Sequence, residues 1–161
     1  MMDSRASAST HHTAPAPGAE EGAWRFTVAP VDASVPQIRR AVRELLRERG
    51  APISENLLHG LLLILSELVT NGVRHAALLT PEIGVEIAFG GGWVRVSVED
   101  RHPYRPTALY AEPDRERTGG RGLLLVREIS GEAGGTCGVD PTPIGGKVIW
   151  AAMPMDLVPV R

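Results

Sequence analysis

One stretch of the chain, Leu57 to His75, limits most strongly what this sequence can fold into. Its first part is almost wholly apolar, and its aliphatic residues recur with the spacing of one broad stripe along a helix. The stripe consists of Leu57, Leu58, Leu61, Leu62, Leu65, Leu68 and Val69. The sequence therefore predicts a central helix against which the other elements must pack.

Three polar residues, Glu67, Asn71 and His75, follow one another at intervals of four on the same predicted helix. Residues with this spacing lie on nearly one face, each about one turn above the last. A carboxylate beside a carboxamide on a rigid helix can position water, a divalent metal ion or both. The alternative interpretation is the ordinary solvated edge of an amphipathic helix, so this pattern needs support from the rest of the chain.

The composition fits one globular domain that is soluble and cytoplasmic. A chain of 161 residues can bury a real core, and a net charge of −2 argues against bulk electrostatic binding to nucleic acid or to an anionic membrane. Cys137 is the only cysteine, which excludes an intrachain disulfide and a cysteine-based zinc cluster. We expect the leucine-rich run to be too short and too polar-edged to span a bilayer, and the N-terminus lacks the apolar segment of a signal peptide.

The remaining chain predicts a mixture of strands and helices between two tails. Residues 1–23 are rich in Ala, Ser, Thr, Pro and Gly and are expected to be disordered, residues 24–155 form the domain, and residues 156–161 are a tail. Strands are expected at 24–29, 83–89, 93–99 and 146–153, the middle two as an antiparallel hairpin. One helix should begin at Ser34 with a capping box and stop at Gly50, and Ser54 should cap the central helix. Residues 131–138 are expected to be a turn-rich return.

Two further features suggest a binding site. Asp100 stands at a predicted strand end, where its carboxylate could accept a hydrogen bond from an exocyclic amine such as that of adenine. A long connection with three prolines follows, which is more often a functional lid than an idle loop. Gly119, Gly120 and Gly122 then lead into an apolar helix, whose N-terminus would attract phosphate, although a glycine cluster alone also fits an ordinary loop. The P-loop pattern is absent, and no strand directly precedes the glycines as a Rossmann turn requires.

The order of these features resembles the GHKL (Bergerat-fold) ATPase superfamily, which includes gyrase B, Hsp90, MutL and histidine kinases. The sequence looks most like the small stand-alone anti-sigma-factor serine/threonine kinases of the actinobacterial type. The resemblance covers residues 24–153: the segment 67–76, ELVTNGVRHA, matches the N box, and the segment 118–126, TGGRGLLLV, matches the G2 box. It implies an α+β two-layer sandwich, with a mixed, mostly antiparallel sheet covered on one face by three helices and ATP between the helix layer and the lid.

The resemblance also implies roles for individual residues. Asn71 would coordinate a Mg²⁺ ion that bridges the ATP phosphates, Glu67 would be the general base, and Asp100 would read adenine. The residues expected around the phosphates are Gly120, Arg121, Gly122 and Leu123. One departure concerns the first glycine box, D-x-G-x-G in the family, which here is DRHPY at residues 100–104 and has no glycine. The turn beneath adenine must therefore be built differently.

Other chemically capable residues receive no catalytic role. We assign no chemistry to His75, and we expect His102 to be an exposed loop residue rather than a lining residue of the pocket. Lys147 is expected to be solvated at a strand edge rather than bound to phosphate, and Cys137 to act as a small hydrophobic residue.

The function implied by the resemblance is that of an ATP- and Mg²⁺-dependent serine/threonine-protein kinase of the anti-sigma type. Such a protein would bind a sigma factor, phosphorylate an anti-anti-sigma (STAS) partner and contact no nucleic acid directly, and a homodimer is compatible with the resemblance. One alternative is a non-catalytic ATP-binding module that controls a transcription factor. A second is an interaction domain without nucleotide binding, against which the presence of Glu67, Asn71, Asp100 and Gly122 argues. The residues do not decide between phosphotransfer and hydrolysis.

Overall fold

The described part of the chain folds into a sheet and a layer of helices. The computed structural model describes residues 21–76, 80–102 and 121–155. In chain order the elements are β1 (Gly22–Val28), α1 (Ser34–Glu48), α2 (Glu55–Ala76), β2 (Ile83–Gly90), β3 (Trp93–Asp100), α3 (Arg121–Glu132), β4 (Thr136–Pro141) and β5 (Lys147–Pro154). Residues 1–20 of the expected disordered tail at 1–23, the C-terminal tail and most of the expected lid lie outside the described residues. The end of the predicted tail was wrong, because Gly22 and Ala23 already pair with β2 as part of β1.

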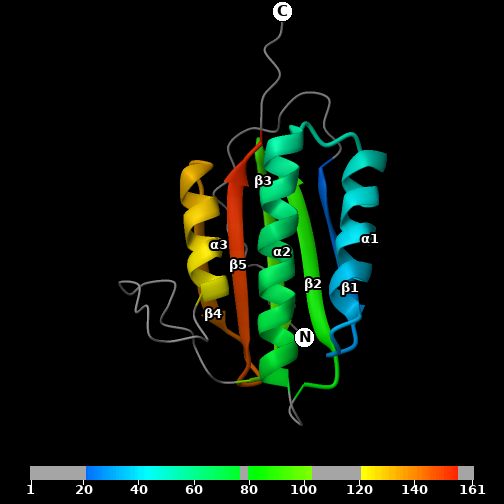
Figure 1. Ribbon diagram of the computed structural model, residues 1–161, viewed down its shortest axis with the longest axis vertical. Coiled ribbons are helices and arrows are strands. Elements are labelled where there is room, and N and C mark those ends of the chain that lie inside the picture. Colours follow the sequence, from blue (N-terminus) through cyan, green and yellow to red (C-terminus); the bar gives the residue numbers. More distant parts are fainter. Residues whose placement is uncertain (1–20, 77–79, 103–120, 156–161) are drawn as a thin grey trace, which may run out of the picture.

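The five strands form one sheet in the order β1-β2-β3-β5-β4, and each neighbouring pair is antiparallel. The three helices lie side by side against one face of this sheet, with α2 in the middle (Figure 1). The predicted α+β two-layer architecture is therefore confirmed, with a sheet that is antiparallel throughout its described part. Because β5 pairs with both β3 and β4, the last strand of the described chain lies inside the sheet rather than at its edge.

The core lies between α2 and the sheet. Every residue of the predicted apolar stripe is buried, and its central members Leu61, Leu65 and Leu68 are fully excluded from solvent. Strands β2 and β3 face them with Val85, Ile87 and other fully buried aliphatic side chains. Burying an aliphatic side chain contributes about 1.5–3 kcal/mol, so this interface supplies most of the driving force that places α2 on the sheet.

Helix α2 is long and apolar enough to cross a membrane by length and composition alone. Its segment Glu55–His75 has 21 residues and contains an 18-residue stretch with a mean hydropathy of 1.3, so the expectation that this run is too short was wrong. In the fold, 56% of that 18-residue stretch is buried inside the domain, where α2 lies over the middle of the sheet (Figure 1). The core helix of a soluble protein passes the same test.

The ends of the helices agree only in part with the predicted caps. The N–H of Leu57 donates to Ser54 Oγ at 3.1 Å, which is the predicted cap of α2. The capping box of α1 was wrong, because Ser34 is the first helical residue and its hydroxyl donates to the carbonyl of Ala29 at 2.7 Å. Helix α1 ends before Gly50, which adopts a φ of 63° that glycine reaches without strain.

Strand β4 was not predicted, since residues 131–138 were expected to form turns. The segment Thr136–Pro141 pairs with β5 along its whole length, with Gly138 opposite Trp150. A Cβ atom at Gly138 would lie 2.7 Å from the Trp150 indole, so the absence of a side chain there makes room for the ring. This strand therefore depends on a neighbour that follows it in the chain rather than on its own β propensity.

Candidate functional site

A small polar pocket opens where the C-terminal half of α2 meets the beginning of α3. Its lining residues are Glu67, Thr70, Asn71, Arg74, Gly122 and Leu123. Four of these were predicted as site residues from the sequence, and the structure brings them together although Glu67 and Gly122 come from different helices. The pocket therefore joins the conspicuous polar residues of the central helix to the glycine-rich segment.

The contact between Glu67 and Gly122 explains why the chain has a glycine at this point. A Cβ atom at position 122 would collide with the Glu67 carboxylate. Glycine lets the backbone of the first turn of α3 approach that carboxylate closely, and the unpaired N–H groups of such a turn favour anions. The site thus places a carboxylate directly beside a segment suited to bind phosphate.

Asn71 combines burial with an unsatisfied oxygen. Its side chain is 8% exposed, and Oδ1 is buried without a hydrogen-bond partner among the described residues. A buried acceptor without a partner is costly, and native structures usually satisfy it with a ligand, an ion or water. An amide oxygen is also a ligand type that Mg²⁺ accepts, so Asn71 fits the metal-binding role expected of it.

Asp100, the residue expected to contact adenine, does not line this pocket and lies instead at the adjacent ends of β3 and β5. Asp100 is opposite Lys147 in the β3–β5 register, and Lys147 Nζ donates to Asp100 Oδ1 at 3.0 Å. Both side chains are almost completely buried, with exposed fractions of 2% for Asp100 and 1% for Lys147. The expectation of a solvated Lys147 was wrong, because pairing of the two strands carries the lysine into the interior.

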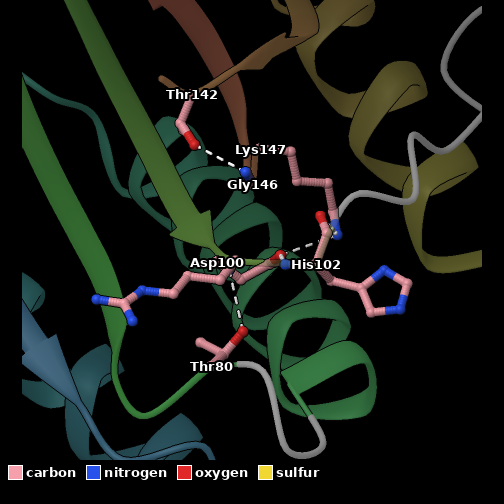
Figure 2. A network of polar contacts seen from close by, with 7 residues as sticks. Thr80, Asp100, His102, Thr142, Gly146 and Lys147 are labelled. Carbon is pink, nitrogen blue, oxygen red and sulfur yellow. Dashed lines mark hydrogen bonds and ion pairs between the residues drawn. The ribbon is translucent and has the colours of Figure 1, made fainter. Parts of the chain in front are cut away.

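Hydrogen bonds build the turn after Asp100 without the glycines of the usual box. The N–H of His102 donates to Asp100 Oδ1 at 2.8 Å, and the N–H of Arg101 donates to Thr80 Oγ1 at 3.0 Å (Figure 2). The first bond is an Asx turn, in which an aspartate accepts from the backbone two residues further on. Thr80 is itself buried, so the turn is held from the segment between α2 and β2 as well.

Two histidines lie beside this buried pair. The rings of His75 and His102 have centroids 5.4 Å apart, and neither histidine is fully exposed. Partial burial is the main cause that lowers the pKa of His75 below its ordinary value of 6.5, and the positive charges of Lys147 and His102 lower it further. His75 thus belongs to the electrostatic surroundings of Asp100, a position that sequence reasoning did not give it.

The remaining predicted site residues have different positions. Leu123 borders the pocket but is 3% exposed and belongs to the hydrophobic core. Arg121 begins α3, nothing is described of its side chain, and Gly120 lies outside the described residues. Thr70 and Arg74 were missed, although each lies three residues after a predicted site residue, a spacing that places them on the same side of α2.

Comparison with known proteins gives one family. The sequence model of the histidine kinase-like ATPase domain matches residues 28–137, which is more than half of the chain and includes Glu67, Asn71, Asp100 and Gly122. No curated protein matches the sequence.

Several solved structures are similar in fold. Full-length ShkA in complex with AMPPNP is 25% identical with a TM-score of 0.48, over 83% of this chain and 32% of ShkA. The domain of a blue-light-activated histidine kinase from Erythrobacter litoralis EL346 is 22% identical with a TM-score of 0.49, over 77% of this chain and 60% of that one. The nucleotide-free catalytic domain of the histidine kinase ThkA is 19% identical with a TM-score of 0.48, over 83% of this chain and 95% of that one. This chain thus spans less than two thirds of the first two structures.

Proposed function

The chain belongs to the family of histidine kinase-like ATPase domains, and from this membership we propose that it is an ATP-binding regulatory protein with serine/threonine-protein kinase activity of the anti-sigma type. Its phosphate acceptor would be a hydroxyl group of an anti-anti-sigma (STAS) partner, and its regulatory target a sigma factor. A cytoplasmic location and a Mg²⁺ requirement are part of the same proposal.

The observation that carries the proposal is the pocket between α2 and α3. It combines the carboxylate of Glu67, the unsatisfied Oδ1 of Asn71 and the close approach of Gly122 at the first turn of a helix. Phosphoryl transfer needs mainly positioning and neutralisation of charge, and these groups supply a base, a metal ligand and an anion-binding helix end. No other described feature combines groups of these kinds.

Each group has a separate task in the proposed reaction. Mg²⁺ bound at Asn71 would supply positive charge against the phosphates. The first turn of α3 would hold phosphate oxygens with its backbone N–H groups. Glu67, one turn before Asn71 on α2, would accept the proton from an attacking hydroxyl group, whether that of a serine side chain or of water.

The base of the nucleotide would be read at the end of β3. The Asp100 carboxylate would accept a hydrogen bond from the exocyclic amine of adenine. Its burial suits that task, because a hydrogen bond to an ionised acceptor is stronger where water is excluded.

Calorimetric titration of ATP with Mg²⁺ into the wild type, Asn71→Ala and Asn56→Ala tests the nucleotide site. Asn56 is exposed in the first turn of the same helix and provides a matched substitution. We expect Asn71→Ala to weaken binding at least about tenfold, the loss that corresponds to about 1.4 kcal/mol, and Asn56→Ala to bind as the wild type does. If the folded wild type gives no heat of ATP binding, the proposed function is wrong.

A second experiment separates kinase activity from nucleotide binding alone. Transfer of labelled phosphate from ATP to STAS proteins is measured with the wild type and with Glu67→Gln. Loss of the general base should slow transfer by about 10²–10⁴-fold while ATP still binds. Binding without transfer to any STAS protein would instead favour the non-catalytic regulatory module.

A further inference from the structure

A polar network at the ends of β3 and β5 contains Asp100, which has a task in the proposed reaction, and Lys147, which has none so far. Its hydrogen bonds join Gly146 to Thr142, Lys147 and His102 to Asp100, and Arg101 to Thr80 (Figure 2). At its centre is the ion pair between Asp100 and Lys147, two residues 47 positions apart in the sequence. A fully buried lysine therefore lies beside the carboxylate that is expected to bind the adenine base.

Stability alone is a weak reason for such a pair. Burying two opposite charges removes both from water, and an apolar pair of similar size is often as stable or more stable. The neighbouring register positions, such as Val98 opposite Ile149, show that apolar pairs do fill the β3–β5 interface. A charged pair at the end of the interface therefore indicates that the function of the site, rather than its stability, requires the Asp100 carboxylate.

The hydrogen bonds fix which carboxylate oxygen is occupied. Both bonds that Asp100 accepts within the described part of the chain end on Oδ1, one from Lys147 Nζ and one from the N–H of His102. Nζ also lies 3.5 Å from the carbonyl oxygen of His102, so the ammonium group holds the turn and the carboxylate together. A carboxylate has acceptor capacity on both oxygens, and this arrangement leaves Oδ2 for another donor.

The surrounding backbone holds the lysine in this position. A Cβ atom at Gly146 would collide with the carbonyl oxygen of Asp100, so glycine is needed for β5 to begin so close to the end of β3. The N–H of Gly146 donates to Thr142 Oγ1 at 2.9 Å, which ties down the turn before the strand. The ammonium group thus has a fixed place, and direct contact of Lys147 with nucleotide phosphates is disfavoured because its side chain is 1% exposed.

We propose that Lys147 is the positioning residue of the base-reading site, and that it orients Asp100 so that Oδ2 accepts the 6-amino group of a purine. Together with the Asx turn of Asp100, it holds the turn after β3, where residues 100–104 contain no glycine. The proposal rests on the proposed function, since it assumes that the pocket binds ATP. The preference for a purine with a 6-amino group would then depend on the ion pair between Asp100 and Lys147.

The test compares ATP with purine riboside triphosphate, which lacks only the 6-amino group. The ratio of their dissociation constants, measured by calorimetry, gives the preference for the amino group. For the wild type we expect a ratio of about ten or more, as for a hydrogen bond to a charged acceptor. In Lys147→Met the carboxylate loses its anchor, and the ratio should fall below about three while purine riboside triphosphate binds within a few-fold of wild type.

Lys147→Arg keeps the inference testable if the methionine variant does not fold. Arginine preserves the positive charge, but its planar fork tends to bind both oxygens of a carboxylate, whereas lysine acts as a point charge on one. The arginine variant should therefore fold, as judged by thermal melting, and still lose most of the amino preference. If the ion pair had only a structural role, arginine would replace lysine, and the variant would keep the wild-type ratio of the two dissociation constants.

Arg25→Met is the matched control. Arg25 forms the neighbouring ion pair with Glu99 at 2.7 Å, but that pair is partly exposed. Its loss should leave the ratio unchanged. A wild type that binds both nucleotides equally, or a folded Lys147→Met that keeps the preference, overturns the inference and leaves the proposed function intact. A wild type that binds neither nucleotide overturns both.

Discussion

Gly122 and Glu67 determine each other's position, which makes the pair a sensitive point of the site. A Cβ atom at residue 122 would displace the Glu67 carboxylate. We expect Gly122→Ala to slow ATP-dependent phosphotransfer or hydrolysis by about 10²-fold or more, the range of a misplaced general base. Activity is measured with labelled ATP.

Gly131→Ala provides the control on the same helix. A Cβ atom at Gly131 would meet nothing within 4 Å, so alanine should leave activity unchanged and stabilise the domain by up to about 1 kcal/mol through its higher helix propensity. Wild-type activity in Gly122→Ala would contradict the assigned geometry.

At the scale of single residues, the sequence predicted those site residues whose positions depend only on local helix geometry. Glu67 and Asn71 are one turn apart on one helix, so helical spacing alone placed both beside the same pocket. Lys147 was misjudged because its burial comes from the antiparallel partner of its strand, Asp100, and no local pattern gives that register. Gly122 could be seen as part of a glycine cluster, but its contact with Glu67 needs the packing of α3 on α2.

At the scale of elements, the beginning of α2 depends on one side chain. Ser54 Oγ accepts a hydrogen bond from the N–H of Leu57, one of the groups that a helix leaves unpaired at its start. We expect Ser54→Ala to lower the free energy of unfolding by about 1 kcal/mol, within the range of 0.5–2 for such caps. Urea denaturation measures the difference.

The same substitution inside the helix should behave differently. The Ser66 hydroxyl donates to the carbonyl of Leu62, which is already the acceptor of the helical bond, so Ser66→Ala should be neutral or slightly stabilising. An equal loss in the two variants would show that Ser54 does not act as a cap.

Elements with strong local signals were predicted within a few residues. The hairpin of β2 and β3 and the central helix follow from alternation, glycine and helical periodicity. Strand β4 has no such signal, since its sequence TCGVDP combines two β-branched residues with a glycine, an aspartate and a proline, which are rare in strands. It becomes a strand because β5 offers a complete set of backbone partners.

For the whole molecule, stability should depend on pH through His75, which is surrounded by charges from α2, β3 and β5. Its pKa is lowered in the folded state, first by burial and then by Lys147 and His102, with Asp100 opposing and Arg74 adding slightly. Between the lowered pKa and the unfolded value of about 6.5, the unfolded chain binds more protons than the folded one. The free energy of unfolding should therefore fall as the pH drops through this window and gain nothing from His75 above it.

Urea unfolding at a series of pH values measures this dependence. His75→Gln should show a smaller loss of stability on acidification than the wild type. His59→Gln, at an exposed position of the same helix, serves as the control and should follow the wild type. The assignment fails if the two glutamine variants lose stability equally.

The place of β5 inside the sheet has a consequence for the newly made chain. Synthesis proceeds from the N-terminus, so β3 and β4 leave the ribosome before the strand that must lie between them. Until β5 emerges, the inner edge of β3 presents unpaired backbone groups and Asp100 has no lysine beside it. A nascent domain of this kind can assemble its helices and first hairpin early, but it completes both the described sheet and the surroundings of Asp100 only with β5.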